Sequence, residues 1–271
     1  MKSVPGIRAV PLDVYGTLFV SGSGEVGTLR EAACAEAFRA ALAAVGLTAA
    51  ASSAADVRYL FEAIEALHAA SRARGIDYPE VDIRDVWRLV VARLAAEAKT
   101  GTIDPEAVDE PLLAVEYECR ANPVWPMPGV RDMLAACRDR GLVLGIVSNA
   151  QFFTRELFPA LLGATLGQLG FARALEVFSY EHGRAKPGDW LFRRAAEALR
   201  SRGIAPAQAV YLGNDMLNDI MPAQRVGFRT ALFAGDRRSH RPRLGDPRTE
   251  TIVPDVTVTA LGQLTECCMV L

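Results

Sequence analysis

One short stretch decides the fold: Ile7-Arg-Ala-Val-Pro-Leu-Asp13-Val-Tyr-Gly-Thr-Leu18. Its first half is an apolar run of strand length. Its second half begins at the acid Asp13 and continues into a turn that contains a glycine. We therefore expect a buried strand that ends at Asp13.

A helical block follows this strand. From about residue 28 to residue 120 the chain is rich in alanine, and apolar residues recur at the spacing of one helix face. Three stripes share this spacing: Phe38, Ala41, Leu42 and Val45; Val57, Leu60, Phe61 and Ile64; and Ile83, Val86, Trp87 and Val90. The prolines of 122–129 forbid a continuing helix. The block is therefore predicted to be a small helical bundle.

Beyond residue 129, short apolar runs alternate with helical stretches. The runs are 142–147, 175–178, 210–212 and 230–233. This alternation predicts a parallel sheet that is covered by helices on both faces. Together with the first strand, it predicts an α/β core domain made of residues 1–20 and 123–271. A helical domain, residues 21–122, would be inserted after the first strand.

Polar residues follow the apolar runs. They are Asp13, Ser148, Asn149, Lys186, Asn214, Asp215 and Asp219. Because ligands of such sheets bind beyond the carboxyl ends of the strands, we expect these side chains to meet at one site. Three carboxylates there would repel one another, and a hard cation such as Mg²⁺ would relieve the repulsion. An aspartate nucleophile beside a lysine, a hydroxyl and a metal ion suits phosphoryl transfer.

Four motifs resemble those of the haloacid dehalogenase-like (HAD) hydrolase superfamily, across nearly the whole chain. They are Asp13-Val-Tyr-Gly-Thr-Leu18, Val147-Ser148-Asn149, Lys186-Pro187 and Gly213-Asn-Asp-Met-Leu-Asn-Asp219. The resemblance implies a three-layer Rossmann-like parallel sheet core with an inserted all-α cap domain. Such a cap closes over the substrate and excludes water.

The resemblance also implies catalytic and substrate-binding roles. Asp13 would be the nucleophile, and Lys186 would stabilise the charged intermediate. Ser148 would hydrogen-bond the phosphoryl oxygens, and Thr17 and Asn149 would help to bind the substrate. The substrate would be a small phosphorylated molecule or, in the dehalogenases, a halogenated one.

Metal ligands follow from the same resemblance. Asp13 would bind Mg²⁺ together with the backbone carbonyl of Tyr15, and Asp215 and Asp219 would complete the site. Asn214 occupies the place directly after Gly213 where the metal-binding aspartate often stands. Either Asp215 shifts into that role, or Asp219 binds with help from Asn214.

Tyr15 departs from the phosphatase pattern. Phosphatases of this superfamily usually carry a second aspartate there, which protonates the leaving alcohol and later activates water. A tyrosine, with an ordinary pKa of about 10, is a poor match for this work near neutral pH. The 2-haloacid dehalogenases of the superfamily resemble this chain at that position, because they carry an aromatic residue there. Their reaction tolerates the missing acid, since halide departs without a proton. Their aspartate forms a carbon ester, and no metal is required.

The fourth motif favours phosphate-ester hydrolysis over dehalogenation. Dehalogenases replace part of it with Ser and Asn, whereas this chain keeps Asp215 and Asp219. Two acids would be unfavourable in a metal-free site that accepts an anionic haloacid. We therefore expect a Mg²⁺-dependent phosphatase that acts on a small phosphate ester through an aspartyl-phosphate intermediate. The alternatives are a 2-haloacid dehalogenase and a non-catalytic binding module with the same fold.

Composition excludes several other classes. The 271 residues are 51% hydrophobic and 23% charged, as in globular rather than disordered chains. The net charge of −2 argues against binding of nucleic acid or anionic membranes through bulk charge. No uncharged stretch supplies the roughly 18 apolar residues of a membrane span. The N-terminal residues show no apolar signal core, so a cytoplasmic protein is expected.

Two surface features complete the expectations. The basic cluster at 237–243 lacks interleaved aromatic residues, so we interpret it as a solvated surface loop rather than a nucleic-acid contact. The Leu- and Ala-rich faces of the cap could pair two copies of the chain in a homodimer.

Overall fold

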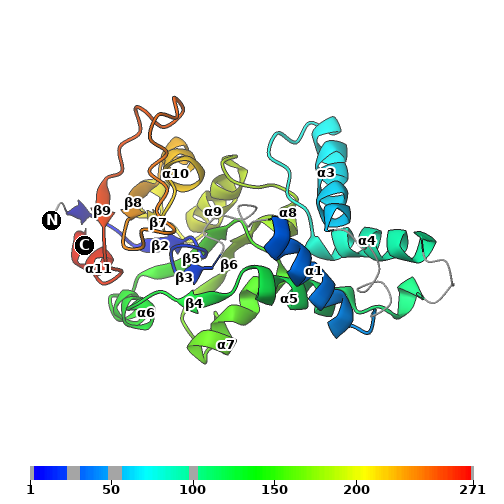
Figure 1. The fold of residues 1–271 in the computed structure, drawn as a ribbon. Coiled ribbons are helices and arrows are strands. Elements are labelled where there is room, and N and C mark those ends of the chain that lie inside the picture. The colour runs from blue at the N-terminus through cyan, green and yellow to red at the C-terminus, as the bar shows by residue number, and fades with distance from the viewer. Residues whose placement is uncertain (1–2, 23–30, 48–56, 98–102, 270–271) are drawn as a thin grey trace.

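The computed structural model describes residues 3–22, 31–47, 57–97 and 103–269. Its centre is a six-stranded parallel sheet in the order β6-β5-β2-β7-β8-β9 (Figure 1). The strands are β2 (Ala9–Leu12), β5 (Val143–Ser148), β6 (Phe171–Phe178), β7 (Val210–Gly213), β8 (Arg229–Phe233) and β9 (Val256–Val258). The five predicted strands are confirmed, and β9 is an addition that the sequence analysis does not predict.

Strand β2 lies at the centre of this sheet, between β5 and β7. Leu12 pairs with Ile146 on one side and with Leu212 on the other. Because all three strands are parallel, their carboxyl ends lie side by side at one edge of the sheet. The residues that follow Leu12 are therefore brought next to the residues that follow β5 and β7.

Alternate residues of the strands enter two separate apolar clusters. Val10 and Leu12 belong to one cluster, whereas Ala9 and Tyr211 belong to the other. The helices that supply the first cluster are α6 (Val130–Asp139), α7 (Leu157–Leu162) and α11 (Gln263–Cys267); those that supply the second are α9 (Trp190–Arg200) and α10 (Met221–Val226). Since successive side chains of a strand point to opposite faces, the two clusters are the two faces of the sheet. The predicted three-layer α/β fold is confirmed.

Shorter elements join the edges of this core. They are the parallel pair β1 (Val4–Pro5) and β10 (Cys268–Met269), the antiparallel pair β3 (Phe19–Ser21) and β4 (Val124–Pro126), and the short helix α8 (Ser179–His182). The pair β3–β4 is formed by the two segments through which the chain leaves the sheet for the helical part and returns from it.

Four helices form a group of their own beside the sheet (Figure 1). This helical group consists of α1 (Glu31–Ala44), α3 (Arg58–Ala73), α4 (Ile83–Glu97) and α5 (Glu110–Ala121). Phe38 stacks on Trp87 with ring centroids 5.5 Å apart, and Trp87 meets Tyr117 edge-on. The group has a separate apolar core, as an inserted bundle would. The boundaries of the two domains stay a prediction.

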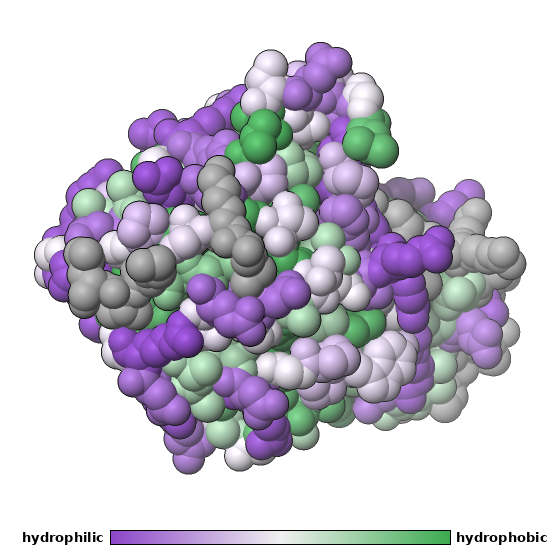
Figure 2. Space-filling model, turned by 90° about the vertical axis from the view of Figure 1, so that its left-hand side faces the viewer, coloured by the Kyte–Doolittle hydropathy of each residue, from purple (hydrophilic) through white to green (hydrophobic). Residues whose placement is uncertain are grey.

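The surface is mixed in character. On the face that carries β9 and α11, hydrophilic and hydrophobic residues are interspersed (Figure 2). Within the described ranges, no helix combines the length and apolarity needed to cross a membrane.

Candidate active site

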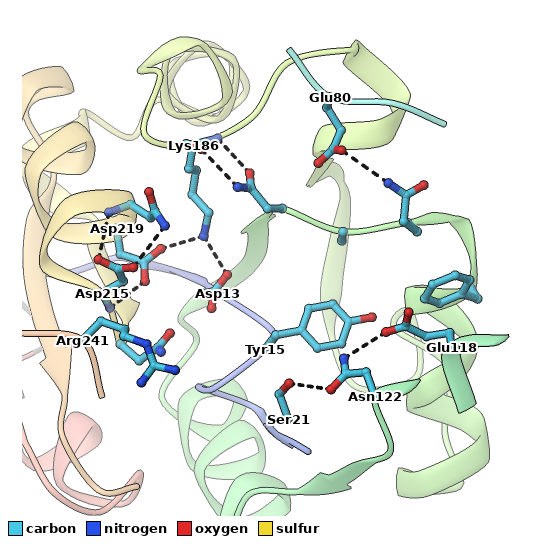
Figure 3. A pocket seen from close by; sticks show the side chains of 16 residues that line it. Asp13, Tyr15, Ser21, Glu80, Glu118, Asn122, Lys186, Asp215, Asp219 and Arg241 are labelled. Atoms are coloured by element: carbon cyan, nitrogen blue, oxygen red, sulfur yellow. Dashed lines mark hydrogen bonds and ion pairs between the residues drawn. The ribbon is translucent and has the colours of Figure 1, made fainter. Parts of the chain in front are cut away.

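Asp13, Lys186 and Asp219 form one buried cluster at the carboxyl edge of the sheet (Figure 3). The Nζ atom of Lys186 lies 2.7 Å from Oδ1 of Asp13 and 2.6 Å from Oδ1 of Asp219. Asp13 follows β2, and Asp219 lies in η4 (Met216–Ile220), a π-helical turn after β7. Burial lowers the pKa of Lys186, but the two carboxylates outweigh this effect and raise the pKa above its ordinary value. The lysine therefore keeps its charge between the two acids.

The position of Lys186 is fixed at its backbone and at its ammonium group. Asn149 Oδ1 accepts the backbone N–H of Lys186 at 2.8 Å, and Asn149 Nδ2 donates to the Lys186 carbonyl at 3.2 Å. The Tyr211 hydroxyl lies 3.2 Å from Nζ and 3.0 Å from Asp219 Oδ1. Asn149 thus positions the lysine, and its predicted contact with the substrate stays a prediction.

The two oxygens of Asp13 differ in their surroundings. Oδ1 accepts hydrogen bonds from Lys186 and from the Ser148 hydroxyl, which lies at 2.9 Å. Oδ2 lies 3.3 Å from the Thr17 hydroxyl, which is also 3.3 Å from Oδ1 of Asn214. Lys186 and Ser148 therefore fix the orientation of the carboxylate through one oxygen.

Two glycines allow these side chains to approach closely. Gly16 has a φ of +81°, and a Cβ there would lie 2.6 Å from the Asn214 amide nitrogen. At Gly213, a Cβ would lie 2.4 Å from Cγ of Asp219. Any larger residue at either position would push a site residue away.

Asp215 forms an ion pair with Arg243, which lies in the loop that the sequence predicts to be solvated. Arg243 Nε lies 3.0 Å from Oδ1 of Asp215, and Arg243 Nη2 lies 2.5 Å from Oδ2. The same carboxylate caps η4 by accepting the backbone N–H groups of Leu217 and Asn218. The interpretation of 237–243 as a merely solvated loop is therefore wrong for Arg243, because its guanidinium turns inward to a buried carboxylate.

A cavity of about 330 Å³ opens over the cluster (Figure 3). Asp13, Tyr15 and Lys186 line it from the sheet, and Glu80 and Glu118 line it from the other side. Buried Asp13 is therefore reachable by a small molecule.

The acids at this edge have cationic partners, which bears on the expected metal ion. Lys186 lies between Asp13 and Asp219, and Arg243 neutralises Asp215. These cations offset part of the repulsion between the acids, but burial and the charges of Asp13 and Asp215 still raise the pKa of Asp219 to about 7. Among the residues that the structure describes, no group of three or more His, Cys, Asp or Glu side chains is arranged to hold an ion.

The oxygen donors nevertheless fit Mg²⁺ at one place. Asp13 and Asn214 both accept a hydrogen bond from the Thr17 hydroxyl, and both residues line the cavity. Mg²⁺ is held by one or two carboxylates together with substrate phosphate oxygens and water, and here Asp13 supplies a carboxylate and Asn214 an amide oxygen. Asp215 and Asp219 are engaged by Arg243 and Lys186, and their role as direct ligands stays a prediction.

Tyr15 points along the cavity wall, and its hydroxyl lies 2.9 Å from the Thr154 hydroxyl. Burial, reinforced by the nearby carboxylate of Glu118, raises the pKa of Tyr15 above its ordinary value. The phenol therefore stays protonated, and a catalytic role for Tyr15 stays a prediction.

Sequence analysis missed several residues of this site. They are Tyr211, Thr154, Arg243, Glu80 and Glu118. Tyr211 lies inside an apolar strand, and the two glutamates lie in or between helices that carry many other acids. The sequence offers no local signal that separates these residues from core or surface positions.

Comparison with known proteins shows the family of the chain. Residues 7–227 match the protein family described as haloacid dehalogenase-like hydrolase. The chain belongs to this family. It is therefore a HAD-like hydrolase, as its four motifs predict.

The matches to individual relatives cover different shares of their length. Haloacid dehalogenase-like hydrolase domain-containing protein 3 of Mus musculus is 32% identical over 180 residues, or 63% of this chain and 66% of the mouse protein. The HAD-like chain spans between 55% and 66% of the length of this and two other curated relatives. Glyceraldehyde 3-phosphate phosphatase of Methanopyrus kandleri is 28% identical over 254 residues, or 93% of each chain.

Among solved structures, the 2-haloacid dehalogenase from Pseudomonas syringae pv. tomato is similar, with a TM-score of 0.61. The match covers 96% of this chain and 97% of the dehalogenase at 21% identity. This likeness shows the fold, which confirms the Rossmann-like α/β core.

Proposed function

We propose that this HAD-like hydrolase is a Mg²⁺-dependent phosphatase that acts on a small phosphate ester through an aspartyl-phosphate intermediate. The observation that carries the proposal is the orientation of Asp13 at the floor of the cavity. Lys186 and Ser148 hold Oδ1, and Oδ2 remains for attack on a bound phosphoryl group. Asp13 is the nucleophile in this proposal.

The side chains around Asp13 suit the charge that develops in phosphoryl transfer. Lys186 supplies a fixed positive charge next to the attacking carboxylate. Ser148 supplies a hydroxyl, and Thr17 a second one on the opposite oxygen. Groups that are already oriented need no rearrangement as the transition state forms, and this is the main source of electrostatic catalysis.

A magnesium ion held by Asp13 and Asn214, with the predicted carbonyl of Tyr15, would neutralise the phosphoryl oxygens as a Lewis acid. Residues 21–122 would form the cap that closes over the substrate. The cytoplasmic location and a homodimer through the cap stay predictions.

The similarity to the Methanopyrus phosphatase supports this choice, because it extends over 93% of both chains. Tyr15 favours one alternative, the 2-haloacid dehalogenase, whose halide leaves without a proton. The pairing of Asp215 with Arg243 also weakens the charge argument against a haloacid, since that acid is already neutralised.

Paired assays separate the two reactions. The phosphatase should release phosphate from 4-nitrophenyl phosphate with Mg²⁺ and lose that activity with a chelator. Acid quenching should trap a phosphoryl group on the native protein, seen by intact-protein mass spectrometry, but not on Asp13→Asn. Halide release from 2-chloropropionate without phosphate release would identify the dehalogenase. Silence in both assays would favour a binding module.

A further inference from the structure

The proposed phosphatase lacks an evident proton donor for its leaving group. Tyr15 stands where these phosphatases carry their second acid, and its hydroxyl is directed to Thr154. An alkyl phosphate needs a proton on the departing oxygen, whereas a nitrophenolate or a halide does not. A proton donor must therefore come from elsewhere in the cavity if the substrate is an alkyl phosphate.

Glu118 is a carboxyl group that faces the cavity beyond Tyr15 (Figure 3). It lies in the last turns of α5, and one of its oxygens, Oε1, accepts a hydrogen bond from Asn122 Nδ2 at 2.9 Å. Asn122 in turn accepts a hydrogen bond from the Ser21 hydroxyl at 2.7 Å. Glu118 is thus tied to β3, eight residues after Asp13, at the place where the chain returns from the helical group.

The hydrogen bond from Asn122 also decides where a proton would reside on Glu118. Because Oε1 accepts from an amide N–H, the acidic proton belongs on Oε2. Among the hydrogen bonds of the described residues, the one from Asn122 to Oε1 is the only one that Glu118 accepts through its side chain. Burial raises the pKa of Glu118 above its ordinary value, and the bond from Asn122 offsets part of that rise. The group is therefore protonated at a higher pH than an exposed glutamate.

Glu80, the other glutamate of the cavity, is bound differently. Its Oε2 accepts a hydrogen bond from Ser179 at 2.7 Å, and its Oε1 accepts the backbone N–H of Val81 at 3.0 Å. Gln151 Nε2 lies 3.5 Å from the same Oε1. Both oxygens of Glu80 therefore accept hydrogen bonds within the protein. Glu80 has no carboxylate oxygen left for a proton transfer to the substrate.

We propose that Glu118 is the catalytic proton donor and acceptor of this enzyme, in place of the carboxylate absent at position 15. The inference rests on the proposed phosphatase function. Asp13 Oδ2 attacks phosphorus, and the bond between phosphorus and the ester oxygen breaks. The electron pair of that bond stays on the ester oxygen, which takes the proton from Glu118 Oε2. The products are the free alcohol, the aspartyl phosphate and the Glu118 carboxylate.

The second half of the cycle returns every group to its starting state. Water attacks the phosphorus of the aspartyl phosphate and gives one proton to the Glu118 carboxylate. The bond between phosphorus and the Asp13 oxygen breaks, and its electron pair restores the Asp13 carboxylate. Inorganic phosphate leaves, and no reactant other than water is consumed.

Leaving-group dependence tests this assignment. The two probes are benzyl phosphate, whose alkoxide must be protonated, and 4-nitrophenyl phosphate, whose phenolate leaves without a proton. In Glu118→Gln, the side-chain carbonyl can still accept from Asn122, so the fold is retained while the proton is lost. We expect kcat/KM for benzyl phosphate to fall about 10²- to 10⁴-fold, and that for 4-nitrophenyl phosphate less than about tenfold. The ratio kcat/KM reports only the steps up to the departure of the leaving group, so the later attack of water on the aspartyl phosphate does not affect it.

Glu106→Gln is the matched control, since it makes the same change at an exposed position outside the cavity. It should alter both substrates by one small factor. An equal loss on both substrates in Glu118→Gln, or no loss on either, would overturn the role of Glu118 while leaving the phosphatase intact. If the native protein hydrolyses neither probe, the proposed function itself fails, and the role of Glu118 fails with it.

Discussion

Arg243 holds Asp215 in a two-pronged ion pair, with Nε 3.0 Å from one carboxylate oxygen and Nη2 2.5 Å from the other. Asp215 is buried and also caps η4, the turn that carries Asp219. The arginine therefore neutralises an acid of the fourth motif and fixes the orientation of its carboxylate. A long loop after β8 thus contributes to the electrostatics of the site.

Replacing Arg243 with methionine should destabilise the protein and change its metal binding. The variant leaves a buried carboxylate without its cation, which costs about 1 to 3 kcal/mol in the free energy of unfolding. Freed Asp215 should also bind Mg²⁺ more readily, so the midpoint of a Mg²⁺ titration should fall. Denaturant melts and calorimetric titration measure the two effects.

Arg248→Met is the control for this change, because Arg248 pairs with Asp246 and half of its side chain is exposed. Its free energy of unfolding should stay close to the native value, because an exposed ion pair contributes little to stability. A similar small effect in Arg243→Met would show that the inner ion pair does not contribute to stability.

Asp13→Asn should abolish turnover and leave the fold intact. The variant removes the attacking oxygen, so kcat should fall by at least the order of 10³-fold. Its amide oxygen can still accept from Lys186 and Ser148, and one of two neighbouring negative charges disappears. The thermal midpoint should therefore stay unchanged or rise. Retained turnover in a purified sample would remove Asp13 from the role of nucleophile.

Much of the site could be predicted from the sequence because a parallel sheet brings its strand ends to one edge. Asp13, Ser148, Lys186 and Asp219 follow apolar runs, and the structure places their side chains in one hydrogen-bonded cluster. Strand β9 is only three residues long, too short for periodicity to reveal it.

The partners of these residues depend on tertiary contacts that leave no local pattern. Arg243 reaches Asp215 only because the loop after β8 folds back over η4. Glu118 occupies an ordinary helical position, and its place at the cavity depends on the hydrogen bonds that link it through Asn122 to Ser21 of β3. The expectation that a metal relieves the carboxylate repulsion also leaves out Arg243, whose pairing with Asp215 has no signal in the sequence.

Asn214→Asp should exchange stability for metal affinity. Asn214 Oδ1 lies near Asp13, but its Nδ2 donates to the Ser239 carbonyl at 2.6 Å. An aspartate there replaces this donor with an oxygen that faces the Ser239 carbonyl oxygen. Without metal, the free energy of unfolding should fall by about 1 to 3 kcal/mol. The added charge should tighten Mg²⁺ binding at least about tenfold, or roughly 1.4 kcal/mol. Thermal melts with and without Mg²⁺ should show a lower midpoint that the metal restores, whereas Asn214→Ala should show no metal-dependent recovery.

Glu80 should make stability depend on pH in a known direction. Burial raises the pKa of Glu80 above its ordinary value, although the Ser179 hydroxyl offsets part of the rise. The folded state therefore binds this proton more tightly than the unfolded state, and stability is lost as pH rises from the ordinary value through the raised one. A glutamine at position 80 does not titrate. The free energy of unfolding of Glu80→Gln should therefore increase relative to that of the native protein as pH rises through this range. Denaturant melts at mildly acidic and mildly alkaline pH measure the difference, with Glu106→Gln on the exposed surface as the control. A difference between Glu80→Gln and the native protein that stays constant with pH would contradict the assigned direction.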